Sequence, residues 1–419
     1  MTDSATDAFS NLRRVQNRTV RVLALGQTLG ALAYGVTISI GALLAVSVSG
    51  DEAFSGLAVA MLTLGAALAA MPLARLANLR GRRWSLGLGN AVALIGIAIV
   101  LSAAALGSFP LLLVGYLFVG SGNAGNLQAR FAATDLASPD RRARDLSMVV
   151  WATTVGAVLG PNLQAPGQLI GDALGMPHLT GAYVFSIVAQ VACLLVFVLG
   201  LRPDPLLHAR ELAAERRGTA ASAGAGIDRP WLARFAMLAV AASHGVMVAV
   251  MSMTPVHLQH EGATLSLIGI TISLHVAGMY ALSPVFGALA DRFGRLTMVL
   301  VGQVQLALSL VLIVADPMNP GLGVLALILL GTGWSAATVS GSALLSEASS
   351  LDRRTARQGR SDSLMSFTGA ASAVAAGGIL SVAGYGGLAG VSFVFVGLVV
   401  LAAPLAARSR GRGGVRTPE

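Results

Sequence analysis

Two histidines lie inside long apolar stretches of the sequence and could carry a proton. His244 falls in the charge-free stretch 235–260, and His275 falls in the stretch 262–290. Imidazole is the side chain that most readily gains or loses a proton near neutral pH. A polar group in apolar surroundings needs a partner, so each histidine is either a functional group or a neutral ring hydrogen-bonded to a neighbouring helix. The sequence leaves both interpretations open.

A polar stripe runs along another apolar segment. Its four members are separated by seven, three and four residues, which places them on one face of an α-helix: Tyr116, Asn123, Asn126 and Arg130. Counted from Pro110 at about 1.5 Å per residue, the two asparagines lie near the middle of a membrane span and Arg130 lies about 30 Å along it. The stripe could bind polar atoms of a substrate. Arg130 could bind an anion or pair with an acidic residue of a gate, and we favour the gate.

The elements that must position these groups are membrane spans. Only 11% of the 419 residues are charged, and the mean hydropathy is +0.75. A span needs about 20 apolar residues, and a charge at the bilayer centre is costly. The stretches without Asp, Glu or Arg are 22–50, 53–74, 84–129, 146–171, 173–201, 235–260, 262–290, 296–315, 317–346 and 363–407. Two of them have double length and contain the turn signals 107–110 and 384–387, so we predict an all-α integral membrane protein of twelve transmembrane helices.

The basic residues predict the orientation of the spans. All of them are Arg, and they fall in the two termini and in alternate loops. The charged residues of the opposite loops are acidic: Asp51, Glu52, Asp172, Glu261 and Asp316. Because short basic loops stay in the cytoplasm, we predict a bacterial inner-membrane protein with both termini inside. The net charge of +9 then reflects topology and contact with anionic lipid headgroups, and we expect no nucleic-acid binding.

An internal repeat divides the chain into two pseudo-symmetric six-helix bundles. Asp135 and the arginines that follow it match Glu347 and its arginines, and Gly81-Arg82 matches Gly294-Arg295. The predicted parts are a cytoplasmic tail (1–21), the first bundle (22–201), a cytoplasmic linker (202–230), the second bundle (231–407) and a second tail (408–419). Repeats of this kind are typical of secondary transporters, whose halves move around a central site.

The segment from Gly287 to Arg295, Gly-Ala-Leu-Ala-Asp-Arg-Phe-Gly-Arg, resembles the loop motif of the major facilitator superfamily. The resemblance covers nearly the whole chain and implies that this loop and its first-half copy close a cytoplasmic gate. In the first copy Asn78 stands where the family has Asp. We therefore expect the gate contacts of the first half to be weaker than those of the second half. The gate residues that it implies are Asn78, Gly81, Arg82, Arg83, Asp135, Arg141, Arg142, Gly287, Asp291, Arg292, Gly294, Arg295, Glu347, Arg353 and Arg354.

Two further segments bear on the type of transport. Gly156, Gly160 and Pro161 match the core of a motif associated with proton-coupled drug exporters of the family, although the same residues also suit small-residue helix packing with a proline kink. The arginine that the family's fourth helix uses in proton coupling is replaced by Tyr116. Any proton coupling must therefore use other groups.

The resemblance also implies which residues line the central cavity, because the first, fourth, seventh and tenth helices do so in the family. The cavity residues are then Gln27, Tyr34, Tyr116, Asn123, Asn126, Arg130, His244, Met247, Met251, Trp334 and Thr338. Methionine and aromatic side chains adapt to varied apolar shapes, and amides orient a ligand. The candidates for proton coupling are His244, His275, Asp135 and Glu347, of which the two acids could equally serve the gate.

The residues present exclude several other classes of protein. The chain has no Lys and no phosphate-binding loop, so it does not hydrolyse ATP, and no enzyme site or cofactor is predicted. The pair His257 and His260 alone does not make a metal site. We predict a monomeric exporter of small amphipathic organic compounds that works by proton antiport. The alternatives are a narrow-specificity importer or facilitator without proton coupling, and a membrane sensor that does not transport.

Overall fold

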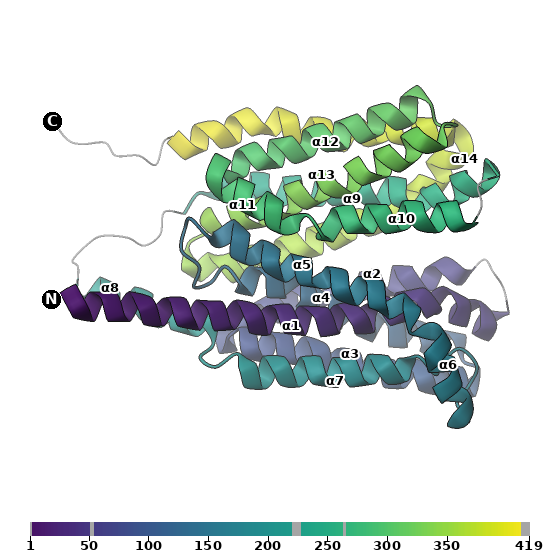
Figure 1. Cartoon of the computed structure of the whole chain (residues 1–419), viewed down its shortest axis with the longest axis horizontal. Helices are drawn as coiled ribbons and strands as arrows, with labels where there is room; N and C mark the ends of the chain where they lie inside the picture. The colour runs from purple at the N-terminus through teal and green to yellow at the C-terminus, as the bar shows by residue number, and fades with distance from the viewer. Residues whose placement is uncertain (1, 51–53, 220–227, 263–264, 412–419) are drawn as a thin grey trace. The chain divides into compact units, whose positions relative to one another are not determined.

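The structure of the chain is a computed structural model that describes residues 2–50, 54–219, 228–262 and 265–411 (Figure 1). Of the segments discussed above, Asp51, Glu52, part of the linker (220–227) and the end of the second tail (412–419) lie outside the described residues. The helices are α1 (Thr2–Ser49), α2 (Ser55–Arg80), α3 (Arg82–Leu106), α4 (Phe109–Ala132), α5 (Arg142–Asn162), α6 (Gln164–Ala173), α7 (Tyr183–Gly200), α8 (Pro205–Thr219), α9 (Pro230–His260), α10 (Leu265–Tyr280), α11 (Ser283–Phe293), α12 (Arg295–Ala315), α13 (Pro320–Glu347) and α14 (Leu351–Gly411).

The chain forms two compact units. The first unit comprises Met1–Ala137 and Met148–Ala223, and the second comprises Ser138–Ser147 and Gly224–Glu419. The loop before α5 and the first residues of that helix therefore belong to the second unit. Most of the predicted linker that the structure describes is helical, because it contains α8.

Within the described residues, nine helical segments are long and apolar enough to cross a membrane. One of them contains two spans, because α14 has non-helical dihedral angles at Gly384 (φ 69°, ψ −177°). The other two spans predicted from the sequence correspond to α4 and to the consecutive helices α5 and α6, which are not among these nine segments.

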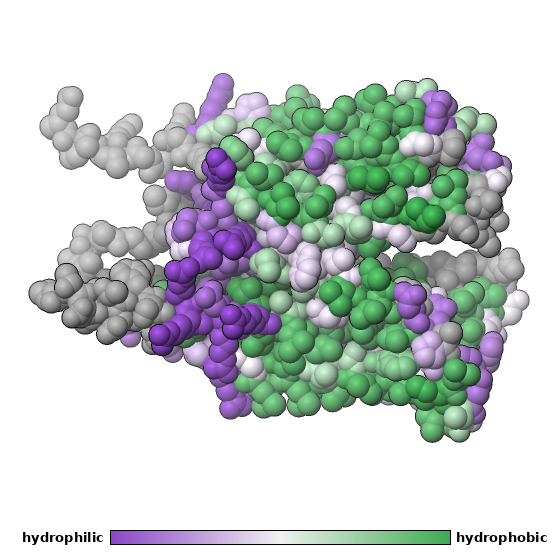
Figure 2. Space-filling view, in the orientation of Figure 1, coloured by the Kyte–Doolittle hydropathy of each residue, from purple (hydrophilic) through white to green (hydrophobic). Residues whose placement is uncertain are grey.

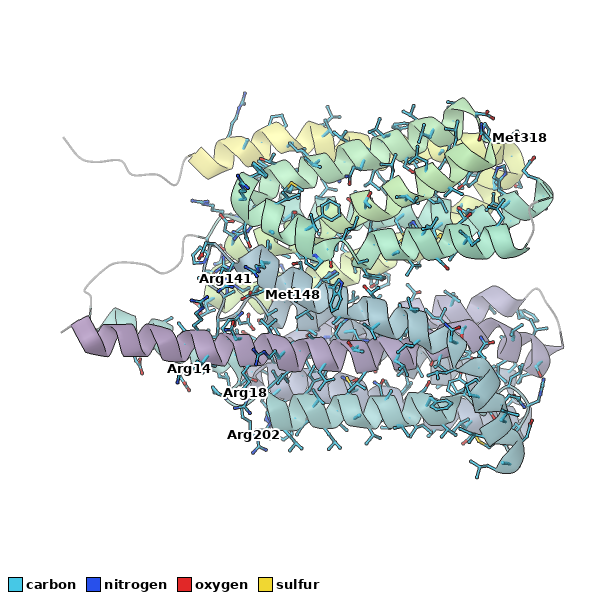
Figure 3. All side chains as sticks on the ribbon, in the orientation of Figure 1. Arg14, Arg18, Arg141, Met148, Arg202 and Met318 are labelled. Carbon is cyan, nitrogen blue, oxygen red and sulfur yellow. The ribbon has the colours of Figure 1, made fainter. Side chains whose placement is uncertain are left out.

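The polar and apolar surfaces of each unit follow the predicted membrane arrangement. Figure 2 shows hydrophobic side chains over the flanks of the helices and hydrophilic side chains at their ends. In the first unit, Arg14, Arg18 and Arg202 lie at the same end (Figure 3). In the second unit, Arg141 and Met318 lie at opposite ends (Figure 3). The basic residues that the pictures label thus lie at one end of each unit.

Helix packing in the first unit depends on close backbone contact. A Cβ atom on Gly65 of α2 would lie 1.9 Å from the carbonyl oxygen of Leu117 in α4, and one on Gly120 of α4 would lie 2.2 Å from that of Leu62. These reciprocal contacts bring the backbones of α2 and α4 together. The helix α4 is the one that carries the polar stripe. Around them lies an apolar core that includes the fully buried Tyr116.

Candidate functional site

A buried ion pair between Arg82 and Asp135 lies at the first unit's copy of the predicted gate motif. Arg82 is the first residue of α3, and its Nε donates to Asp135 Oδ2 at 2.8 Å while its Nη2 donates to Oδ1 at 3.3 Å. The side chains are 1% and 0% exposed. A two-point arginine–carboxylate contact fixes both groups, and removal of either partner of a buried pair is strongly destabilising.

The second unit contains the matching pair and an additional helix cap. Arg295, the first residue of α12, contacts Glu347 at the end of α13 and also Asp291, whose Oδ1 accepts from Nη2 at 3.1 Å. The Asp291 carboxylate in turn accepts from the backbone N–H groups of Ala143 (3.1 Å) and Arg144 (2.8 Å) at the start of α5. A carboxylate is stabilised at a helix N-terminus by these otherwise free N–H groups and by the helix dipole.

Gly287 permits this cap by letting α11 approach the start of α5. A Cβ atom at Gly287 would lie 2.2 Å from Ser147 Oγ and 2.7 Å from the carbonyl oxygen of Ala143. The hydroxyl of Ser283, one turn earlier, donates to the carbonyl oxygen of Ser147 at 3.1 Å. These contacts hold α11 against the start of α5 within the second unit.

In the first unit the linker helix α8 contacts the last turn of α2, where Asn78 stands in place of the family's Asp. Arg210 of α8 donates to the carbonyl oxygen of Asn78 at 2.7 Å and also to its side-chain oxygen. Asp204, just before α8, accepts from the backbone N–H of Arg83 at 2.8 Å, and its other oxygen accepts from Leu206 N and Leu207 N. One carboxylate thus caps the starts of both α3 and α8.

We expect Asp204→Ala to lower the free energy of unfolding by about 1 to 2 kcal/mol, because it removes the cap of α8 and the partner of the Arg83 N–H group. Thermal unfolding of the purified protein in detergent measures the loss. The control is Glu211→Ala on the same helix, whose side chain is 70% exposed and should contribute little. Equal unfolding temperatures for the two variants would contradict the proposed cap.

The other arginines of the predicted gate are spread over several contacts. Asp228, before α9, binds Arg353 Nη1 at 3.0 Å, Arg357 Nη1 at 2.6 Å and the N–H of Ser350 at 3.3 Å. Partial burial raises the pKa of Asp228, but these donors outweigh it and hold the pKa below its ordinary value. Arg354 is buried, Arg141 and Arg142 are half-buried, and Arg292 is exposed with its guanidinium 5.3 Å from the ring of Phe293.

Among the predicted cavity residues of the first unit, Gln27 and Asn126 are amide side chains, whereas Tyr116 lies in the apolar core. Gln27 of α1 donates to Thr153 Oγ1 at 2.9 Å, and the amide of Asn126 lies against Gly30, one turn along α1. The remaining oxygens, Gln27 Oε1 and Asn126 Oδ1, are buried without a hydrogen-bond partner. Such acceptors are costly to bury unless a water or ligand donor reaches them.

The other members of this set have different surroundings. Tyr116 is fully buried in the apolar core, where its hydroxyl donates to the carbonyl oxygen of Gly41 at 3.3 Å and lies 3.4 Å from that of Tyr183. Tyr34 and Asn123 are half-buried. The guanidinium of Arg130 is buried and lies 5.0 Å from the ring of Phe131.

The second unit brings most of its predicted cavity residues together around one aromatic cluster. Trp334 Nε1 donates to His244 Nδ1 at 3.1 Å, and the ring of Tyr280 meets that of Trp334 edge-on with centroids 5.7 Å apart. Met247 and Met251 belong to the same apolar cluster. Thr338, one turn beyond Trp334, is buried and its hydroxyl has no hydrogen-bond partner. A tryptophan, a tyrosine, a histidine and two methionines can bind a planar apolar ring.

The two histidines are in opposite tautomers when neutral. His275 Nδ1 lies 2.9 Å from the carbonyl oxygen of Leu327, which can only accept, so Nδ1 carries the hydrogen and the buried Nε2 is a base without a hydrogen-bond partner. Nδ1 of His244 accepts from Trp334, so its hydrogen is on Nε2. A proton added to Nδ1 of His244 would replace this hydrogen bond with two opposed donors.

The motif of Gly156, Gly160 and Pro161, here called the helix 5 motif, lies in α5, and its glycines are packed against α1. A Cβ atom on Gly156 would lie 2.4 Å from the carbonyl oxygen of Thr28, and one on Gly160 would lie 2.9 Å from Gly35. These distances agree with the helix-packing interpretation of the motif. The helix that contains it ends at Asn162, directly after Pro161.

Several residues of these sites were missed by reasoning from the sequence. Asp204 could have been found, because an Asp followed by Pro205 is a common helix start. Asp362 is a fully buried carboxylate near the start of α14, and the run of charged residues before it gives no signal of this burial. Tyr280 and Arg210 carry no sequence signal of their roles, which arise only from packing.

Comparison with known proteins identifies the family of this chain. The family described as Major Facilitator Superfamily matches residues 23–262 and 236–418. The chain belongs to the major facilitator superfamily. This major facilitator protein is 35% identical over 385 residues to the uncharacterized MFS-type transporter YddS of Bacillus subtilis (strain 168), with 90% of this chain and 88% of the relative covered. It is 30% identical over 404 residues to the riboflavin transporter RfnT of Brucella anthropi, with 94% and 97% covered.

Solved structures support the same fold. The crystal structure of the human organic anion transporter MFSD10 (TETRAN) superimposes with a TM-score of 0.75 at 19% identity, covering 93% of this chain and 99% of that one. At this identity the likeness shows the fold alone. The family membership confirms the sequence-based prediction of a membrane transporter rather than an enzyme. Among the described residues, no group of three or more His, Cys, Asp or Glu side chains could hold a metal ion.

Proposed function

We propose that this major facilitator transporter exports small amphipathic organic compounds that contain an aromatic ring, by proton antiport. The observation that supports this most directly is the cluster of His244, Trp334 and Tyr280, in which a titratable side chain is hydrogen-bonded to the residue best suited to stack on a ring. The location proposed is the bacterial inner membrane, with the arginine-rich ends of the helices in the cytoplasm and the protein acting as a monomer.

The hydrogen bond between Trp334 and His244 links ring binding to proton binding. Protonation of His244 at Nδ1 removes the acceptor that fixes the indole, so the charged histidine and the fixed indole exclude each other. A substrate that stacks on the indole in its fixed position therefore favours the neutral histidine. This differential binding is the requirement for antiport, in which substrate and proton occupy the protein alternately.

His275 is the second proposed proton carrier. Its Nε2 atom is buried and has no hydrogen-bond partner, while its Nδ1–H is held by the carbonyl oxygen of Leu327 on α13. A base in this position can accept a proton without first breaking a contact. His275 also has a backbone role, because α10 and α13 meet closely where Gly331 faces the carbonyl oxygen of His275.

A dye experiment tests the proposal. Inside-out vesicles that contain the protein and an acidic lumen are treated with amphipathic aromatic drugs, and a pH-sensitive dye reports loss of protons from the lumen. We expect substrate-dependent loss that is abolished in His244→Gln or His275→Gln and retained in His260→Gln, whose side chain is exposed at the end of α9. Substrate movement that never dissipates the proton gradient would contradict proton antiport.

A second candidate function is uptake of one planar heterocyclic nutrient without proton coupling. It is favoured by the similarity to RfnT, which is named as a riboflavin transporter, and by the two aromatic rings of Trp334 and Tyr280. Accumulation of labelled riboflavin by intact cells, unaffected by a protonophore and lost in Trp334→Leu, would support it over export.

A further inference from the structure

A separate cavity lies at the end of the second unit that is opposite Arg141. Its volume is about 160 Å³, and Met318, which Figure 3 labels at that end, is one of its lining residues. The walls come from the ends of α9, α10 and α13, from the turn after α12 and from the second half of α14. None of the residues that carry the proposed transport function lines it.

The inner wall of this cavity is a fixed pair of aromatic rings. Tyr385 is 8% exposed and stacks on His257 with centroids 4.3 Å apart and an interplanar angle of 13°. The Tyr385 hydroxyl is 2.8 Å from Thr254 Oγ1, and His257 Nε2 donates to the carbonyl oxygen of Pro317 at 2.7 Å. Both rings are therefore held in place by hydrogen bonds at their polar atoms before any ligand arrives.

The outer part of the cavity is acidic. Glu261 and Asp316 line it and are exposed, and the described residues of its lining include neither Arg nor Lys. Because His257 donates from Nε2 to a carbonyl oxygen, it needs no positive charge to keep its contact. Buried Ile313 and Leu258 supply apolar surface on the inside. Carboxylates outside and aromatic and aliphatic groups inside match an amphipathic cation.

We propose that this cavity binds a small organic ammonium ion, with the charged nitrogen near Glu261 and Asp316 and the apolar part against Tyr385. Its volume suits about six to eight non-hydrogen atoms, since an engineered cavity of about 150 Å³ holds benzene. A divalent metal is disfavoured because the described residues contain no group of three metal ligands. The proposal does not depend on the transport function above.

Binding of benzylammonium to the full-length protein in nanodiscs tests the site, with benzyl alcohol as a neutral probe of the same shape. Calorimetric titration should give saturable binding of benzylammonium that benzyl alcohol does not match. The double variant Glu261→Gln/Asp316→Asn should bind about tenfold more weakly, because both changes remove charge at exposed positions without disturbing the core. Asp352→Asn, an exposed acid at the start of α14 and outside the cavity, should bind like the unchanged protein.

A second pair of variants separates the aromatic wall from general effects on folding. Tyr385→Phe keeps the ring and should retain binding, whereas Tyr385→Leu should weaken it. Equal affinity for benzyl alcohol, equal affinity in the charge-removed double variant, or absence of saturable binding would each overturn the proposal. These measurements report binding rather than transport, so a failure of the antiport hypothesis leaves their outcome unchanged.

Discussion

Replacing Asp135 with Asn is expected to lower the free energy of unfolding by about 3 to 5 kcal/mol, because it removes the carboxylate charge that binds Arg82 at two points in buried surroundings. The two side chains are 1% and 0% exposed, so water cannot replace the lost partner. Reversible unfolding in mixed micelles, followed by tryptophan fluorescence, measures the difference.

Two controls show whether the loss comes from the missing carboxylate charge. The double variant Arg82→Met/Asp135→Leu removes both charges and should recover most of the stability, since buried pairs can often be replaced by apolar residues of similar volume. Arg353→Gln alters a pair in which the arginine side chain is 69% exposed and should cost under about 1 kcal/mol. A double variant as unstable as Asp135→Asn alone would show that shape, not charge, sets the stability of this site.

The membrane spans could be predicted because their physical cause depends only on the order of residue types along the chain. A charge in the bilayer is costly, so charge-free stretches mark the spans, and glycine is needed where the chain turns. The predicted turn at 107–110 appears as the end of α3 at Gly107 (φ 62°), and that at 384–387 as the break at Gly384 (φ 69°). Both glycines adopt backbone angles that other residues avoid.

Breaks inside a span could not be predicted in the same way. The span predicted over 146–171 is divided into α5 and α6 after Pro161, and that over 262–290 is divided into α10 and α11 shortly before Pro284. However, Pro72 and Pro255 lie inside helices that continue through them. A proline removes one backbone hydrogen bond in every case, and the packing of neighbouring helices decides whether the helix is interrupted.

The gate residues stay a prediction, but the structure shows the partners of two of their carboxylates. The carboxylates of Asp135 and Glu347 are bound by Arg82 and Arg295, whereas the sequence also offered Arg130 as a partner for either. The matching pairs Gly81-Arg82 and Gly294-Arg295 could have identified the arginines that bind these carboxylates, because a repeat preserves contacts as well as residues. The role of α8 had no such signal, since the matching segments of the repeat lie outside the linker.

The glycines of the helix 5 motif allow the packing and exporter interpretations to be compared directly. Gly156→Ala is expected to lower the free energy of unfolding by about 3 kcal/mol, because the new Cβ would lie 2.4 Å from a backbone oxygen of α1 and 2.5 Å from the backbone nitrogen of Leu32. Backbone atoms cannot rotate away, so α1 and α5 must separate. Reversible unfolding in mixed micelles measures the loss.

Gly377→Ala is the matched control, since a Cβ atom at that position in α14 meets nothing within 4 Å. There the substitution should be neutral or stabilising by up to about 1 kcal/mol, as alanine favours the helix. If Gly156→Ala kept full stability and instead let protons leak without substrate, the packing explanation would be wrong. The motif would then control the coupling of the transport cycle, because a leak without unfolding requires that α5 take part in the conformational change itself.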